Sequence, residues 1–205
     1  MSHRDTFNAL IDAMKIAVAA LRDAHVPFVL GGSVAAWARG GPEPDNDLDL
    51  MVPPAHAEAA LDALARAGMR PERPAEEWLF KAWHGDVMID VIFMPSGVEM
   101  TDEVVDRADT ISVMAIATPV MALEDVLITM LYALDEHALD YSKLLAITRA
   151  LREQIDWPSL GTRASGSPFA KAFMTLVEEL RIAPASGRTR PEPARGRVRV
   201  VGAGE

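Results

Sequence analysis

The sequence predicts an α/β (α+β) fold, in which a small mixed β-sheet is flanked by helices and followed by a C-terminal helical bundle. Three observations predict it. Amphipathic helical repeats alternate with short apolar strands over the first half of the chain, one strand carries an acid at every second position, and beyond position 118 the apolar residues recur only at helical spacing. We therefore expect a sheet-containing core at 1–117, a helical domain at 118–182, and a disordered tail at 183–205 that is rich in Arg, Pro and Gly.

Composition narrows the class of protein. The chain has 205 residues, half of them hydrophobic, with no cysteine and a net charge of −10. Disulfides and thiolate metal sites are therefore excluded, and no apolar run approaches the roughly 20 residues that a membrane span needs. We expect a cytoplasmic protein with no membrane contact. The acidic net charge argues against a broadly basic surface for nucleic acid.

The core elements alternate between helix and strand. Apolar residues at three- and four-residue steps predict a helix near the N-terminus, and proline or glycine pairs mark the ends of the elements that follow. In order, we expect a helix at 4–24, a strand at 27–30, a short helix at 33–39, an acidic strand up to position 52, and a helix at 55–67.

A β-hairpin should follow, with strands at 78–83 and 87–93. If Gly85 and Asp86 form its loop, Lys81 lies directly opposite Asp90 and on the same face. The remaining elements expected are a helix at 101–108 with Thr101 as its N-cap, a strand at 111–116 that ends at Thr118-Pro119, and helices over 120–134, 144–151 and 168–182.

The stretch from Leu30 to Val52 carries the chemistry. Period-two alternation puts Asp47 and Asp49 on one face of a strand, with the apolar residues between them on the other. Two ionised carboxylates side by side are unfavourable without a cation, which suggests a hard divalent metal such as Mg²⁺. The alternative is a solvated strand face. Before this strand, the Gly31-Gly32-Ser33 turn allows backbone N–H groups and a hydroxyl to approach an anion.

Gly31-Gly32-Ser33 followed by Asp47-Leu48-Asp49 resembles the signature of the DNA-polymerase-β-like nucleotidyltransferase superfamily. The third carboxylate that this superfamily has on a later strand corresponds to Asp90. The resemblance covers roughly residues 26–134. Within the superfamily, the spacing looks more like the abortive-infection (AbiEii-type) toxin and aminoglycoside nucleotidyltransferase groups. The spacing is nevertheless long for the pattern, and prolines stand in the loop between the two motifs.

The resemblance implies an enzyme that moves a nucleoside monophosphate from an NTP, such as ATP, to an acceptor hydroxyl and releases pyrophosphate. Asp47, Asp49 and Asp90 would hold two Mg²⁺ ions, or Mn²⁺ in their place, and the Gly31-Gly32-Ser33 turn would hold the phosphates. A tRNA end, an aminoglycoside-like small molecule and a protein hydroxyl all fit as acceptors. The alternative is a weakly catalytic nucleotide-binding regulator of the same fold, with a protein partner, as one component of a toxin–antitoxin pair.

Several basic and aromatic residues have two interpretations. Arg39 and Lys81 would neutralise the triphosphate or would be surface charges, and Lys81 could instead serve only as an ion-pair partner for Asp90. Lys143 could reach the nucleotide from the helical domain, but a solvated helix face is the simpler expectation. The tryptophans are most simply core or cleft-wall residues, although one could stack on a base; they are Trp37, Trp78, Trp83 and Trp157.

Overall fold

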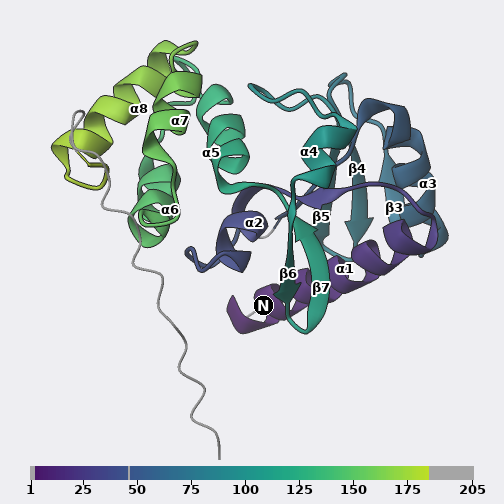
Figure 1. The fold of residues 1–205 in the computed structure, drawn as a ribbon. Coiled ribbons are helices and arrows are strands. Elements are labelled where there is room, and N and C mark those ends of the chain that lie inside the picture. Colours follow the sequence, from purple (N-terminus) through teal and green to yellow (C-terminus); the bar gives the residue numbers. More distant parts are fainter. Residues whose placement is uncertain (1–2, 46, 185–205) are drawn as a thin grey trace, which may run out of the picture.

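The computed structural model describes residues 3–45 and 47–184 and contains one seven-stranded sheet with helices packed against it and a further group of helices that follows it in the chain (Figure 1). The helices are α1 (His3–Asp23), α2 (Gly32–Ala38), α3 (Ala57–Arg66), α4 (Asp102–Asp106), α5 (Leu123–Tyr132), α6 (Ser142–Leu151), α7 (Trp157–Ala164) and α8 (Pro168–Glu179). The strands are β1 (Val29–Leu30), β2 (Asp47–Met51), β3 (Arg70–Glu72), β4 (Leu79–His84), β5 (Val87–Ile92), β6 (Asp109–Val113) and β7 (Ile116–Val120). A 3-10 turn, Pro54–His56, leads into α3.

The sheet is mixed, as the sequence predicts. Its strand order is β3-β4-β5-β2-β1-β7-β6. β2 runs parallel to β5 and antiparallel to β1, while β1 runs parallel to β7. The two strands that carry the acids are therefore neighbours near the middle of the sheet.

The two faces of the sheet differ in what covers them. α1 and α3 pack against one face, where Leu48, Leu50 and Ile89 are completely buried. This follows from the sequence, because α1 presents an apolar stripe at helical spacing to the alternate residues of the strands. The acidic positions of β2 and β5 point to the other face, which leaves them free of the core.

The hairpin prediction is confirmed, whereas the single strand at 111–116 is wrong. β4 and β5 pair around Gly85, and Lys81 lies opposite Asp90. Further along, β6 and β7 form a second hairpin, because Met114 and Ala115 adopt positive φ angles of 48° and 69° and reverse the chain. Such angles are unusual for residues other than glycine, so the sequence carries no turn signal there.

Besides the second strand of that hairpin, β3 and α7 were not predicted. β3 adds an edge strand to the sheet beyond the β4–β5 hairpin. Along the chain, the last strand, β7, continues to Val120, three residues beyond the domain boundary expected at position 117. Most of the tail predicted at 183–205 lies outside the described residues. Within the part that the structure describes, no helix is long and apolar enough to cross a membrane.

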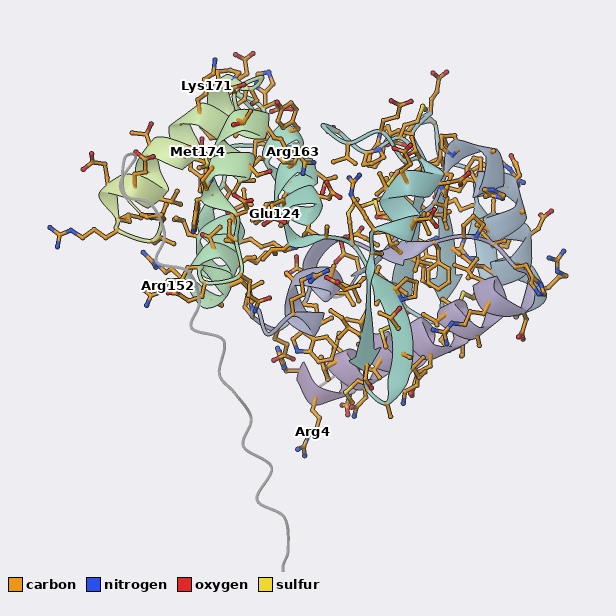
Figure 2. The ribbon with its side chains drawn as sticks, in the orientation of Figure 1. Arg4, Glu124, Arg152, Arg163, Lys171 and Met174 are labelled. Atoms are coloured by element: carbon orange, nitrogen blue, oxygen red, sulfur yellow. The ribbon has the colours of Figure 1, made fainter. Side chains whose placement is uncertain are left out.

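A buried carboxylate joins the sheet-containing part to the C-terminal helices. Asp125 on α5 is 1% exposed and accepts hydrogen bonds from Arg107, which follows α4, at 2.7 and 3.0 Å. It also accepts one at 2.6 Å from Arg163, on the side of α7 that faces α5 (Figure 2). One buried acid is therefore shared by cations from both parts, which fixes how α5 and α7 sit against the core.

Candidate active site

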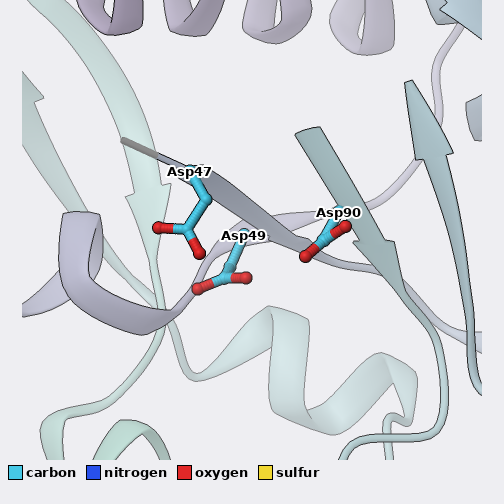
Figure 3. A group of neighbouring side chains, drawn as sticks. All are labelled: Asp47, Asp49 and Asp90. Atoms are coloured by element: carbon cyan, nitrogen blue, oxygen red, sulfur yellow. The ribbon is translucent and has the colours of Figure 1, made fainter. Parts of the chain in front are cut away.

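Three carboxylates gather on the sheet face that α1 and α3 leave uncovered. Asp47 and Asp49 come from β2, and Asp90 comes from β5, where it lies directly opposite Asp49. One oxygen from each lies within 4.8 Å of the others. Figure 3 shows the three side chains on the side of the strands away from α1, the purple helix. The predicted convergence of these acids is present in the structure.

The carboxylates of this cluster repel one another. Burial, followed by the charges of Asp47 and Asp90, raises the pKa of Asp49 to about 7. Burial also raises the pKa of Asp90; Lys81, whose Nζ lies 3.8 Å from Asp90 Oδ1, opposes that rise, and Asp47 adds to it. The cluster is therefore short of positive charge.

Two oxygens of the cluster also accept no hydrogen bond from the described residues. Asp47 Oδ1 and Asp90 Oδ1 are buried and form no hydrogen bond with the described residues. Buried carboxylate oxygens are normally hydrogen-bonded, paired or bound to a metal. The donor set, three converging carboxylates with unused oxygens, suits a hard divalent cation such as Mg²⁺ or Mn²⁺.

The Gly31-Gly32 turn lies directly against these acids. The Gly31 N–H donates to the Asp49 carbonyl at 2.9 Å, and Gly32 has a φ of +51°. A Cβ on Gly32 would stand 1.6 Å from Asp49 Oδ2, and one on Gly31 would stand 2.6 Å from Met51 Cε. Only glycine allows the backbone this close to the acidic strand, which explains the glycine pair in physical terms.

Ser33 and Asp45 tie the turn to the following loop. Ser33 is 4% exposed, and its Oγ accepts a hydrogen bond from the Asp45 N–H at 3.2 Å. The Asp45 carboxylate in turn forms a salt bridge with Lys143, near the start of α6. Lys143 is close enough that its charge lowers the pKa of Asp49 against the larger effects that raise it.

Lys143 thus lies near the acidic cluster, which the sequence analysis did not favour. It comes from the helical domain, 98 residues beyond its partner Asp45. In the sequence, Lys143 stands just before the helix predicted at 144–151, shortly after Asp140 and Tyr141. That position does not reveal how close Lys143 lies to the acids.

Arg39 has a different environment from the one predicted. Its guanidinium donates to the carbonyls of Val120 and Met121 at 2.8 to 3.2 Å and pairs with Asp109 at 2.8 Å. Its side chain is only 10% exposed. These contacts hold the end of α2 against β7, whereas Lys81 lies beside the acids as the sequence predicts.

The chain matches known proteins at the level of family and fold. A model of a family described as uncharacterised nucleotidyltransferases matches residues 19–180. No curated protein sequence gives a significant match.

Two solved structures share the fold. The solution structure of the antibiotic-resistance factor ANT(2'')-Ia is 15% identical, with a TM-score of 0.57, over 83% of this chain and 94% of that one. The crystal structure of ANT(2'')-Ia in complex with adenylyl-2''-tobramycin is 17% identical, also with a TM-score of 0.57, over 78% of this chain and 96% of that one.

These findings confirm the resemblance to the polymerase-β-like nucleotidyltransferases. Nucleotidyltransferases generally use divalent metals, and the acidic cluster provides ligands for them. Because the family model spans most of its length, the chain belongs to this nucleotidyltransferase family.

Proposed function

We propose that this protein transfers a nucleoside monophosphate from an NTP to an acceptor hydroxyl and releases pyrophosphate, with Mg²⁺ as its metal. The observation that carries the proposal is the cluster of Asp47, Asp49 and Asp90, with buried oxygens that accept no hydrogen bond from the described residues, placed against a glycine turn. A purely structural cluster of this kind would be unfavourable, since three acids share one partly buried space with Lys81 as the nearest paired cation.

The three acids would hold two Mg²⁺ ions. Bound there, the ions would neutralise the phosphates and stabilise the leaving oxygen. Asp47 and Asp49, on alternate positions of one strand, would each face the ions, and Asp90 would complete the set from the neighbouring strand. Asp90 is also the acid best placed to orient the acceptor, because it lies on the side of the cluster away from the glycine turn.

The transfer replaces one bond at the α-phosphorus with another. The acceptor oxygen forms a bond to the α-phosphorus, the bond from that phosphorus to the bridging oxygen of the β-phosphate breaks, and pyrophosphate leaves. The hydroxyl proton would pass to Asp90 as that bond forms.

The phosphates would lie along the Gly31-Gly32-Ser33 turn. Lys143 can supply positive charge there, because its partner Asp45 is an exposed loop residue and the pair can exchange for phosphate at low cost. Lys81 would act from the other side through Asp90. Arg39 could bind phosphate only by giving up buried contacts with two carbonyls, so we assign it to supporting α2.

The acceptor can be identified by a label-transfer assay with several candidate acceptors. One structural neighbour holds adenylyl-2''-tobramycin, which supports a small-molecule hydroxyl as one candidate. A tRNA end and a protein hydroxyl are the other candidates from the sequence. The test is incubation of the purified protein with Mg²⁺ and each α-labelled NTP, with water alone, small hydroxyl compounds, cell RNA and cell protein as separate acceptor pools.

Two substitutions separate chemistry from folding. Asp47→Asn and Asp49→Asn should abolish label transfer, whereas Asp62→Asn, at an exposed position on α3, should leave it unchanged. Transfer that survives in both site variants would contradict the proposal. Nucleotide binding without transfer to any pool would instead favour the regulatory, toxin–antitoxin type of function.

A further inference from the structure

The uncovered face of the sheet continues beyond Asp90 to the β3 edge. Cross-strand pairing places eight side chains on this face in two adjacent rows that cross β2, β5, β4 and β3. The first row is Asp49, Asp90, Lys81 and Glu72, and the second is Asp47, Met88, Trp83 and Arg70. Neighbouring strands are about 4.8 Å apart, so the β3 edge lies roughly 10 Å from Asp90.

Side chains from β3 and β4 form a connected surface in these rows, which we call the Trp83 platform (Arg70, Glu72, Lys81 and Trp83). The Trp83 Nε1–H donates to Glu72 Oε2 at 2.7 Å, and the Arg70 guanidinium lies 5.3 Å from the centre of a Trp83 ring. The Glu72 oxygen that accepts from Trp83 also lies 3.5 Å from Arg70. The indole is therefore held in one orientation while remaining partly exposed.

The platform is less covered than the opposite face of the same strands. Ala82 and Ile89, on that face, are completely buried, whereas Lys81, Trp83 and Met88 are all partly exposed. An aromatic ring with a guanidinium over it, and a lysine paired with Asp90, thus lie beside the acids on a partly exposed surface.

The strand order places this surface opposite the glycine turn. The turn follows β1, on one side of β2, and the platform lies beyond β5, on the other side. In a displacement at phosphorus the attacking and leaving oxygens are roughly in line on opposite sides. With the phosphates at the glycine turn, the acceptor must approach across β5 and β4, which is where the platform lies.

We propose that the Trp83 platform binds the acceptor, and that the acceptor is a small ring compound carrying both a hydroxyl and a negative charge, such as a phosphate. This inference rests on the proposed function. The ring would lie on Trp83, and its anionic group would contact Lys81 or Arg70, with the reacting hydroxyl directed to Asp90.

The charges decide between classes of acceptor. The platform has two cations and one acid, and the Glu72 carboxylate is already shared by Trp83 and Arg70. A polycation, such as an aminoglycoside with protonated amino groups, would meet like charges at Lys81 and Arg70. The net charge of −10 argues against a large polyanion, which would contact much of the acidic surface, whereas a small anion would meet mainly the local cations Lys81 and Arg70.

Binding tests the platform independently of catalysis. The full chain, saturated with Mg²⁺ and a non-hydrolysable NTP analogue to fill the nucleotide site, would be titrated by calorimetry and tryptophan fluorescence. The probes are glucose 6-phosphate, glucose, a nucleoside 5′-monophosphate, its nucleoside, inorganic phosphate and tobramycin. We expect at least one phosphorylated ring compound to bind at least tenfold more tightly than its unphosphorylated counterpart and than inorganic phosphate. The two phosphorylated probes distinguish a sugar from a nucleotide source.

Variants link that binding to the platform. Trp83→Leu and Lys81→Ala should each weaken it at least tenfold, while Trp78→Leu, which removes an exposed tryptophan just before β4, should not change it. Equal affinity for phosphorylated and unphosphorylated probes, tighter binding of tobramycin, or binding unaffected by Trp83→Leu would overturn the platform. Absence of transfer to every acceptor pool, with these affinities as expected, would overturn the proposed catalysis and leave the platform standing as a binding site.

Discussion

Replacing Asp49 with asparagine should stabilise the metal-free protein at neutral and alkaline pH. Burial and the charges of Asp47 and Asp90 raise the pKa of Asp49 from 3.8 to about 7 in the folded protein. Between these two values the unfolded chain releases the Asp49 proton more readily than the folded one. The free energy of unfolding must therefore fall as pH rises through this window, and the loss levels off above about pH 7.

The size of the effect follows from the pKa. Each pKa unit corresponds to about 1.4 kcal/mol, so a rise to about 7 costs the folded state about 4 kcal/mol once Asp49 is ionised. At pH 5 the cost is about 2 kcal/mol, because the folded protein then keeps the proton. Asparagine has nearly the same shape and no charge, so Asp49→Asn should be more stable than the natural protein by up to about 4 kcal/mol at pH 8, and this gain should fall by roughly half at pH 5.

Urea unfolding in the presence of a chelator measures this directly. The natural protein, Asp49→Asn and the exposed control Asp62→Asn would be compared at pH 8 and pH 5. Adding Mg²⁺ at pH 8 should stabilise the natural protein and narrow the difference, since the ion would bind the folded acidic cluster. A variant that is less stable than the natural protein at pH 8 without metal, or a gain that does not change with pH, would refute the electrostatic reasoning.

Three other substitutions test separate features of the structure. Gly32→Ala should cost about 2–4 kcal/mol of stability and abolish transfer, because φ is +51° and the new Cβ would overlap Asp49 Oδ2. Urea midpoints would measure the loss of stability, and label transfer would measure the loss of activity. A fully active variant would contradict this prediction. Asp125→Asn should lower the free energy of unfolding by about 3 kcal/mol, since it leaves Arg107 and Arg163 around a buried neutral group. An unchanged urea midpoint would argue against a stabilising role for this buried ion pair. Lys143→Ala should change stability by less than about 1 kcal/mol because its ion pair is exposed, yet raise the Kd for NTP several-fold; an unchanged Kd would remove Lys143 from the nucleotide site.

The local sequence pattern was enough to predict the direction of Asp47 and Asp49 and the pairing of Lys81 with Asp90. Alternation along β2 sets the direction of Asp47 and Asp49, and the loop around Gly85 sets the register that places Lys81 opposite Asp90. Both are short-range properties of the chain, and the structure confirms both. The neighbouring position of β2 and β5, by contrast, was expected from the family resemblance and not from any local signal.

The elements that were missed have physical reasons in common. β3 is three residues long and contains Pro71, which lacks an N–H and is unusual within strands, so it forms as an edge strand through pairing with β4. α7 is short and contains Gly161, which weakens helix propensity, and its stability comes from Leu160 and Trp157 buried against neighbouring helices. Tertiary contacts decide such segments, and a single sequence does not display them.

The roles of Arg39 and Lys143 show the same limit at the level of function. Both are basic residues, and the sequence analysis weighed phosphate neutralisation against a surface charge for Arg39 while it preferred a solvated helix face for Lys143. In the structure Arg39 uses its donors on the carbonyls of Val120 and Met121, so a phosphate could recruit it only by leaving buried acceptors without partners. Lys143 is paired with a carboxylate on an exposed loop, and exchange of that carboxylate for phosphate costs little. The cation near the glycine turn in the sequence thus holds α2 in place, while the cation with an exposed, exchangeable partner comes from the helical domain.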